Sequence, residues 1–152
     1  MPRSRQLLCW VYAAIALVAL VGTWHQNLSY FRPDEGLVLG FVAATGRFWP
    51  ETLANPASTS ITIDLGLFLV AASVLMVVES RRLAIPFVWI YIVLGILVAI
   101  SVTFPLFLIA RERRLGAVGE VTADSVATSR DSLGLAALGL GMGVFTLWTL
   151  LR

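Results

Sequence analysis

The side chain best placed to do chemistry is Asp64, the single carboxylate just inside the apolar run of the stretch from Leu53 to Arg82, which closes on Glu79 and two arginines. A carboxyl group within a membrane-spanning helix costs a few kcal/mol, so it is a functional candidate by default. Held away from water, such an acid can donate a proton to a substrate. Ser60 lies one helical turn earlier and can hydrogen-bond it. The alternative is structural: Asp64 sits near the headgroups and pairs with Arg32 or Arg47 of the preceding loop.

A second pair of acids, Asp34 and Glu35, lies in that loop. One predicted span precedes the loop and the next follows it, so both acids enter from the same side as Asp64. We therefore predict Asp64, Asp34 and Glu35 as catalytic candidates, although adjacent acids in a loop are more often simply solvated. The predicted substrate-binding residues, from the loop and the helix after it, are Tyr30, Trp49, Asn55, Ser60 and Phe68.

Glu79 lies fifteen residues after Asp64, roughly 22 Å along a helix, too far for a carboxylate pair acting on one atom. With Arg81 and Arg82 it is interpreted as a charge cluster at the membrane surface. His25 could shuttle protons or bind a metal with the loop acids, but a lone interfacial histidine more often does neither. Cys9 is the single cysteine. The sequence therefore predicts no metal site on the usual ligands and no cofactor.

The composition requires a membrane. Of 152 residues, 59% are hydrophobic and only 13% charged, and the mean hydropathy is +0.88, whereas a soluble domain carries about 25% charged residues. All eleven basic residues are arginines at the ends of apolar runs. That placement indicates anchoring at the interface rather than a nucleic-acid-binding surface.

The predicted fold is an all-α, polytopic membrane helix bundle forming a single domain, with a short interfacial or re-entrant helix. The expected spans are 6–24, 59–78, 84–109 and 132–151, with the interfacial helix at 36–45 and a polar loop at 111–131. Pro105 is expected to bend the third span. A cleaved signal peptide is the competing interpretation of the first run, but that run is longer than a signal core and lacks a clean cleavage site.

An even number of spans places both termini on one side of the membrane, and we expect that side to be the cytoplasm, across a cell inner (plasma) membrane. The arginines divide five to six between the two sides, so the positive-inside rule does not determine the orientation. We favour cytoplasmic termini because Arg3 and Arg5 lie directly before the first span. Gly139-x-x-x-Gly143 in the last span could bring another helix close and form a homo-oligomer, or it reflects only the frequency of glycine in membrane helices.

Four segments around Asp64 resemble a known family: ANPAS, then IDL, then ESRRL, then FPLFLIARERR. They are similar to an uncharacterised family of small bacterial multi-span membrane proteins, a domain of unknown function, over about residues 50–115. The last span, 132–151, lies outside the resemblance. The resemblance implies a membrane location and a helical fold, and it implies no settled activity.

Two functions from different classes follow. The layout is similar to that of small membrane-bound terpene cyclases, which implies an isoprenoid cyclase in which Asp64 protonates a lipophilic substrate with help from Asp34 or Glu35. The cyclase hypothesis is based on this similarity of layout alone. The alternative is a non-enzymatic accessory or structural subunit that binds a lipid or a larger membrane partner. A closed aromatic cavity around Asp64 favours the first, and an exposed glycine face with no cavity favours the second.

Overall fold

The computed structural model describes residues 3–118 and 129–151, and every regular element in these ranges is helical. The α-helices are α1 (Arg3–Asn27), α2 (Leu37–Thr52), α3 (Pro56–Leu83), α4 (Val88–Leu94), α5 (Ile100–Val118) and α6 (Ser129–Leu150). Two short 3₁₀ turns, Leu28–Tyr30 and Pro33–Glu35, lie between α1 and α2. The prediction of an all-α fold is confirmed.

Four helical segments are long and apolar enough to cross a membrane, as the hydropathy predicted. They are Arg3–Tyr30, Pro56–Leu83, Val88–Ala117 and Leu133–Leu150. Large apolar side chains such as Leu17, Leu67 and Leu140 point outward from them. A surface of this kind is stable against hydrocarbon rather than water, so the chain has the form of a multi-pass membrane protein.

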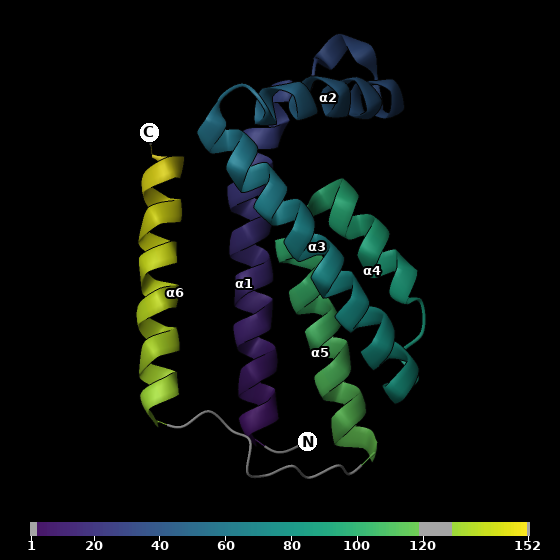
Figure 1. Ribbon diagram of the computed structural model, residues 1–152, viewed down its shortest axis with the longest axis vertical. Helices are drawn as coiled ribbons and strands as arrows, with labels where there is room; N and C mark the ends of the chain where they lie inside the picture. Colours follow the sequence, from purple (N-terminus) through teal and green to yellow (C-terminus); the bar gives the residue numbers. More distant parts are fainter. Residues whose placement is uncertain (1–2, 119–128, 152) are drawn as a thin grey trace.

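The fifth long helix, α2, lies across one end of the bundle (Figure 1). It begins after Gly36, whose φ of 70° suits glycine, and it runs to Thr52, beyond the expected end at 45. Its first turn exposes Leu37, Val38 and Leu39. A helix lying across the bundle with apolar residues exposed suits the membrane interface.

Helix α3 has defined ends. Asn55 Oδ1 accepts a hydrogen bond from the Ser58 N–H at 2.9 Å, and Ser58 Oγ accepts one from the Asn55 N–H, which together form a capping box. Pro56 occupies the first turn, where its missing N–H is not needed. The helix ends at Leu83 and is capped by Ala84, which has the left-handed conformation with φ 51°.

The third apolar segment does not run straight across. The rings of Tyr91 in α4 and Phe107 in α5 are 5.7 Å apart, whereas sixteen residues of straight helix would separate them by about 24 Å. Helices α4 and α5 therefore fold back on each other, joined by the π-helical turn Gly95–Ala99. This hairpin begins and ends at the same end of the bundle, unlike the single 84–109 span that we expected.

Gly95 makes this reversal possible. A Cβ atom at this position would lie 3.0 Å from Thr103 Oγ1 and 3.2 Å from Ile100 Cδ1, so any side chain would push α4 and α5 apart. The π turn is a known way to bend a helix sharply. Pro105, which we expected to bend the segment, lies inside the continuous helix α5.

The buried core lies between α3, α4 and α5. It contains Ala72, Met76, Leu83, Ile85, Ile92, Ile100, Phe107 and Leu115, of which Met76 and Phe107 are fully buried. Helix α1 packs along α5. The reversal thus brings both α4 and α5 against α3 around this core.

Helix α6 runs in the same direction as α1. A Cβ on Gly22, near the end of α1, would meet Thr146 Cγ2, near the end of α6, at 3.1 Å. The start of α1 and the end of α6 consequently lie at opposite ends of the bundle (Figure 1). The arrangement follows from the α4–α5 hairpin, which brings the end of α5 back to the end of the bundle where α3 ends; the side of the membrane that each terminus faces stays a prediction.

Candidate functional site

Asp64 lies on the outward surface of α3. Successive helical residues are about 100° apart, which places Asp64 roughly 120° around the helix from the core residue Met76. Its side chain is exposed. Within residues 3–118 and 129–151 it has no hydrogen bond and no ion pair, so the contact with Arg32 or Arg47 that we considered is not formed.

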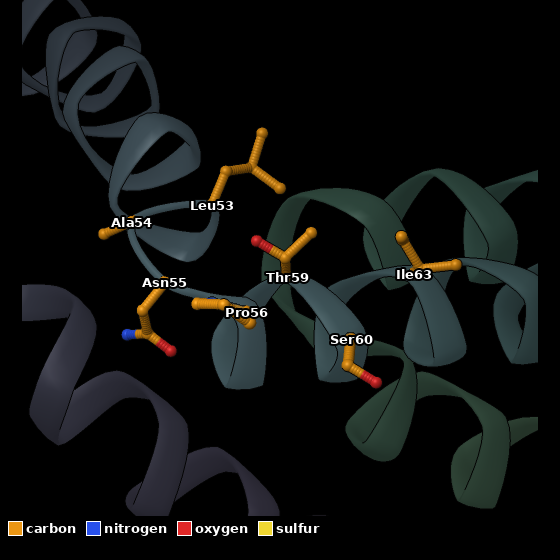
Figure 2. A pocket seen from close by; sticks show the side chains of 7 residues that line it. All are labelled: Leu53, Ala54, Asn55, Pro56, Thr59, Ser60 and Ile63. Carbon is orange, nitrogen blue, oxygen red and sulfur yellow. The ribbon is translucent and has the colours of Figure 1, made fainter.

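Asn55 and Ser60 line an open depression at the start of α3. It is formed by the turn after α2 and the first turns of α3, namely Leu53, Ala54, Asn55, Pro56, Thr59, Ser60 and Ile63 (Figure 2). Asn55 is occupied by helix capping. The depression is wide open and Asp64 does not line it.

The loop acids have different surroundings from each other. Arg47 donates two hydrogen bonds to the Glu35 carboxylate, at 2.8 and 2.7 Å, and two more to the Tyr30 carbonyl oxygen. These bonds from Arg47 hold the pKa of Glu35 below its ordinary value. Asp34 is exposed. The Tyr30 hydroxyl donates a hydrogen bond to Glu51, a partner that the sequence did not suggest.

The predicted aromatic residues pack in two places, since Tyr30 and Trp49 both contact Phe48, and Phe68 packs elsewhere. Trp49 of α2 meets Phe48 edge to face, with ring centroids 5.6 Å apart. Phe68, one turn after Asp64 on α3, packs edge to face on Phe104 of α5 at 6.2 Å. Trp49 and Phe68 thus belong to different elements, and of the predicted substrate-binding residues only Asn55 and Ser60 share one depression.

A charge network that we did not predict joins three helices at the end of the bundle where α1 begins. Arg111 of α5 contacts Glu79 of α3 at 2.6 Å and its neighbour Glu112 at 3.0 Å. Glu112 also pairs with Arg5 of α1 at 2.8 Å, and Glu79 with Arg82 at 3.1 Å. The Glu79 and Glu112 side chains are only 11% and 7% exposed.

Sequence reasoning missed this network because it treated 84–109 as a single span, which placed Arg111 at the end of the bundle opposite to Glu79. Glu79 was interpreted as interfacial with Arg81 and Arg82, and only the Arg82 contact is present. The missed signal was Gly95 in the middle of an apolar run too long for one span. We call the end of the bundle that holds this network the arginine-rich end.

Among the described residues, no group of three or more His, Cys, Asp or Glu side chains is arranged to hold a metal ion. One helical turn from Asp64 on α3 lies the hydroxyl of Ser60, so the face around Asp64 carries one carboxylate and one hydroxyl. Such a face can form an ionic contact or donate a proton.

The fold and these contacts define a small, all-helical, multi-pass membrane protein. The chain belongs to the family described as protein of unknown function DUF2834, whose profile matches residues 11–113. The resemblance inferred from residues 50–115 is thereby confirmed, and the match extends through most of α1. It includes Asp64 and the network residues Glu79, Arg111 and Glu112, and it ends before α6. No curated protein and no solved structure matches the chain.

Proposed function

We propose that this protein is a non-catalytic subunit that binds another membrane protein through the outward face of α3, with Asp64 as the ionic contact. The observation that carries the proposal is Asp64 itself. It is exposed on a helix long and apolar enough to cross the membrane, and it forms no ion pair within the described part of the chain. A carboxylate in that position lacks the partner that intramembrane charges ordinarily have.

The depth of Asp64 supports this proposal. Glu79 and Arg82 mark the arginine-rich end of α3, and Asp64 lies roughly 22 Å from Glu79 along the helix. The hydrocarbon core is about 30 Å thick, so Asp64 lies inside it and several ångströms from the opposite surface. A carboxylate at such a depth costs a few kcal/mol when unpaired, which a cationic side chain on a neighbouring helix would offset.

The partner at this face is a different protein rather than a second copy. Copies of one membrane protein insert in the same orientation, so a symmetric dimer through this face would bring two Asp64 side chains to the same depth. Like charges in a low-dielectric medium repel strongly. The face therefore fits a partner helix with an arginine, lysine or histidine at the matching depth.

Self-association can occur elsewhere, through α6. Cβ atoms built on Gly139 and Gly143 meet nothing within 4 Å, so this face leaves room for the close helix approach that Gly-x-x-x-Gly favours. We propose it as a separate homo-oligomer contact. Replacing Gly143 with Ile should abolish a self-crosslink through α6 and leave any contact at α3 intact.

The isoprenoid cyclase hypothesis is the rival explanation of Asp64. It needs a chamber that excludes water around the acid and holds a lipophilic substrate. Two hollows on the described surface are the depression at Asn55 and an apolar groove between α3 and α4 lined by Val74, Trp89 and Ile92 among others. Asp64 lines neither, so we give the cyclase second place and include it in the test.

The test places a photo-crosslinking amino acid on α3 in native membranes. Ala71 lies two turns from Asp64 on the same exposed face, and the control position Val70 lies about 120° away from Asp64. We expect a defined protein crosslink at Ala71 that disappears in an Asp64→Asn variant, and no such product at Val70. Asn preserves the shape of the side chain and removes its charge.

Crosslinks of equal yield at both positions, or a product at Ala71 that survives Asp64→Asn, would contradict the proposal. The same membranes should be incubated with polyprenyl substrates. If the wild type forms cyclised products and Asp64→Asn abolishes them without altering crosslinks, the cyclase hypothesis replaces the subunit proposal.

A further inference from the structure

The two ends of the bundle differ strongly in charge. The arginine-rich end comprises the first turns of α1 and the last turns of α3 and α5. It contains seven arginines, Arg3, Arg5, Arg81, Arg82, Arg111, Arg113 and Arg114, against the two acids Glu79 and Glu112. At the opposite end, the described residues outside the spans include Arg32 and Arg47 against Asp34, Glu35 and Glu51.

Most of this positive charge is not neutralised within the described part of the chain. The two acids are occupied by Arg5, Arg82 and Arg111. Arg81, Arg113 and Arg114 are exposed and form no ion pair with any residue there. The contact between Arg111 and Glu79 holds the last turns of α3 and α5 together, so these cations lie at one surface rather than on separate helices.

We propose that the arginine-rich end is a binding surface for the headgroups of anionic phospholipids on the cytoplasmic side of the membrane. Clusters of four to eight basic residues next to membrane helices attract anionic lipids. Guanidinium groups also bind phosphate in a two-pronged geometry. Acyl chains of the bound lipids would lie along the exposed apolar surfaces of α3 and α5.

The hairpin is what creates this surface. If α4 and α5 formed one straight span, Arg111, Arg113 and Arg114 would lie on the other side of the membrane, and the arginines would divide almost evenly. Because the chain returns, the seven arginines of α1, α3 and α5 named above share one end, whereas Arg32 and Arg47 lie at the other. The positive-inside rule counts basic residues near the ends of spans, and it then places the arginine-rich end in the cytoplasm and the end of α6 outside.

The first experiment tests the side on which these arginines lie. Cys9 is replaced with Ser in the full chain, and single cysteines are introduced at Asp34 or Arg114, two exposed positions. A membrane-impermeant maleimide should label Asp34→Cys in intact cells and Arg114→Cys only after the cells are opened. A straight third span puts both positions on one side, so equal labelling from one side would overturn the proposal.

The second experiment tests lipid binding. The purified full chain is reconstituted in phosphatidylcholine alone or in mixtures with phosphatidylglycerol, and retained lipid is measured by native mass spectrometry. The double variant Arg113→Gln/Arg114→Gln should weaken retention of phosphatidylglycerol roughly thirtyfold. This figure combines the two arginines, each of which contributes about fivefold near an anionic surface. Both arginines are exposed and unpaired within the described part of the chain, so the fold should be unaffected.

Arg32→Gln is the matched control, because Arg32 is an exposed arginine at the opposite end. It should leave retention of phosphatidylglycerol unchanged. Equal retention of both lipids by the wild type, or an equal loss in the control and the double variant, would overturn the proposal. Soluble glycerol phosphate should not displace the lipid at matched concentration; if it does, the surface binds free phosphate esters rather than a membrane lipid, and the proposal fails.

Discussion

Helix α3 carries two carboxylates with opposite surroundings. Glu79, near its end, is 11% exposed and contacts both Arg82 and Arg111. Asp64, fifteen residues earlier, is exposed and forms no ion pair within residues 3–118 and 129–151. The same helix therefore has one acid whose partners are supplied by the chain itself and one that pairs with none of the described residues.

The difference depends on which arginines the fold brings near. Glu79 and Glu112 share Arg111 because the α4–α5 hairpin returns to the end of α3. Among the described residues no arginine contacts Asp64, and Arg47 is held by Glu35 and the Tyr30 carbonyl. Polar groups near Glu79 stabilise the monomer, whereas Asp64 is available to a molecule outside it.

The largest expected effect comes from breaking the network at Arg111. Arg111→Ala removes one cation from two nearly buried carboxylates. Breaking a buried ion pair by deleting one partner is strongly destabilising, and since Arg111 is itself partly exposed we expect a loss of about 3 kcal/mol. The measurement is the free energy of unfolding in detergent, by denaturant titration.

Arg113→Ala is the control for this prediction. Arg113 lies two residues later on α5, is exposed, and has no ion pair in the described part of the chain, so its loss should change stability by no more than about 0.5 kcal/mol. Equal losses in the two variants would show that the network contributes nothing particular to the fold.

The hairpin that delivers Arg111 to Glu79 can be broken at its turn. Gly95→Val would place methyl groups against Thr103 and Ile100, where even a Cβ is crowded. Overpacking of this kind typically costs about 1–3 kcal/mol, and we expect the melting temperature in detergent to fall accordingly. A double variant with Arg111→Ala should lose less than the sum of the two, because both changes affect the same contact.

Gly66→Val is the matched control, since Gly66 of α3 has nothing within 4 Å of its Cβ position. A valine there would face open surface and should be tolerated. If Gly66→Val destabilises as much as Gly95→Val, the effect reflects loss of glycine in a membrane helix rather than crowding in the turn.

The sequence was sufficient for the fold class and for the membrane location. Both depend on composition and on the length of apolar runs, which are local properties. The residues of the Asp64 candidate site could be named but not assembled, because their distances depend on how α2 and α3 pack.

The reversal at Gly95 could not be read from hydropathy. A hairpin and a straight span of one apolar segment have the same composition, and only tertiary contacts such as Tyr91 with Phe107 separate them. The predicted positions of Arg111 and of the chain's end both depended on treating the segment as a single span. The network of Glu79, Arg111 and Glu112 exists only because the chain reverses, and so it was missed.

A smaller effect is expected at Glu35, the paired acid outside the spans. Arg47 holds the pKa of Glu35 below its ordinary value. The ion pair therefore stabilises the fold at any pH above the ordinary pKa of glutamate, and this stabilisation is lost as the pH falls through the lowered pKa. At neutral pH the melting temperature of the wild type should be about 2 °C higher than that of Glu35→Gln, and the difference should vanish in acid.

Asp34→Asn controls for the loss of a loop charge, because Asp34 is adjacent and exposed. It should show little difference from the wild type across the same pH range. A Glu35→Gln difference that grows on acidification would contradict the assigned ion pair with Arg47.

The smallest effect on stability is expected at Asp64, and it completes the comparison between the two acids of α3. Asp64→Asn removes a charge that pairs with nothing in the described part of the chain, so the free energy of unfolding of the purified protein should change by less than about 0.5 kcal/mol. Glu79→Gln, the same change at the paired acid, should destabilise clearly because Arg82 and Arg111 lose their acceptor. Equal losses would mean that Asp64 has a stabilising contact within the protein, and its outward face could then no longer be assigned to a partner.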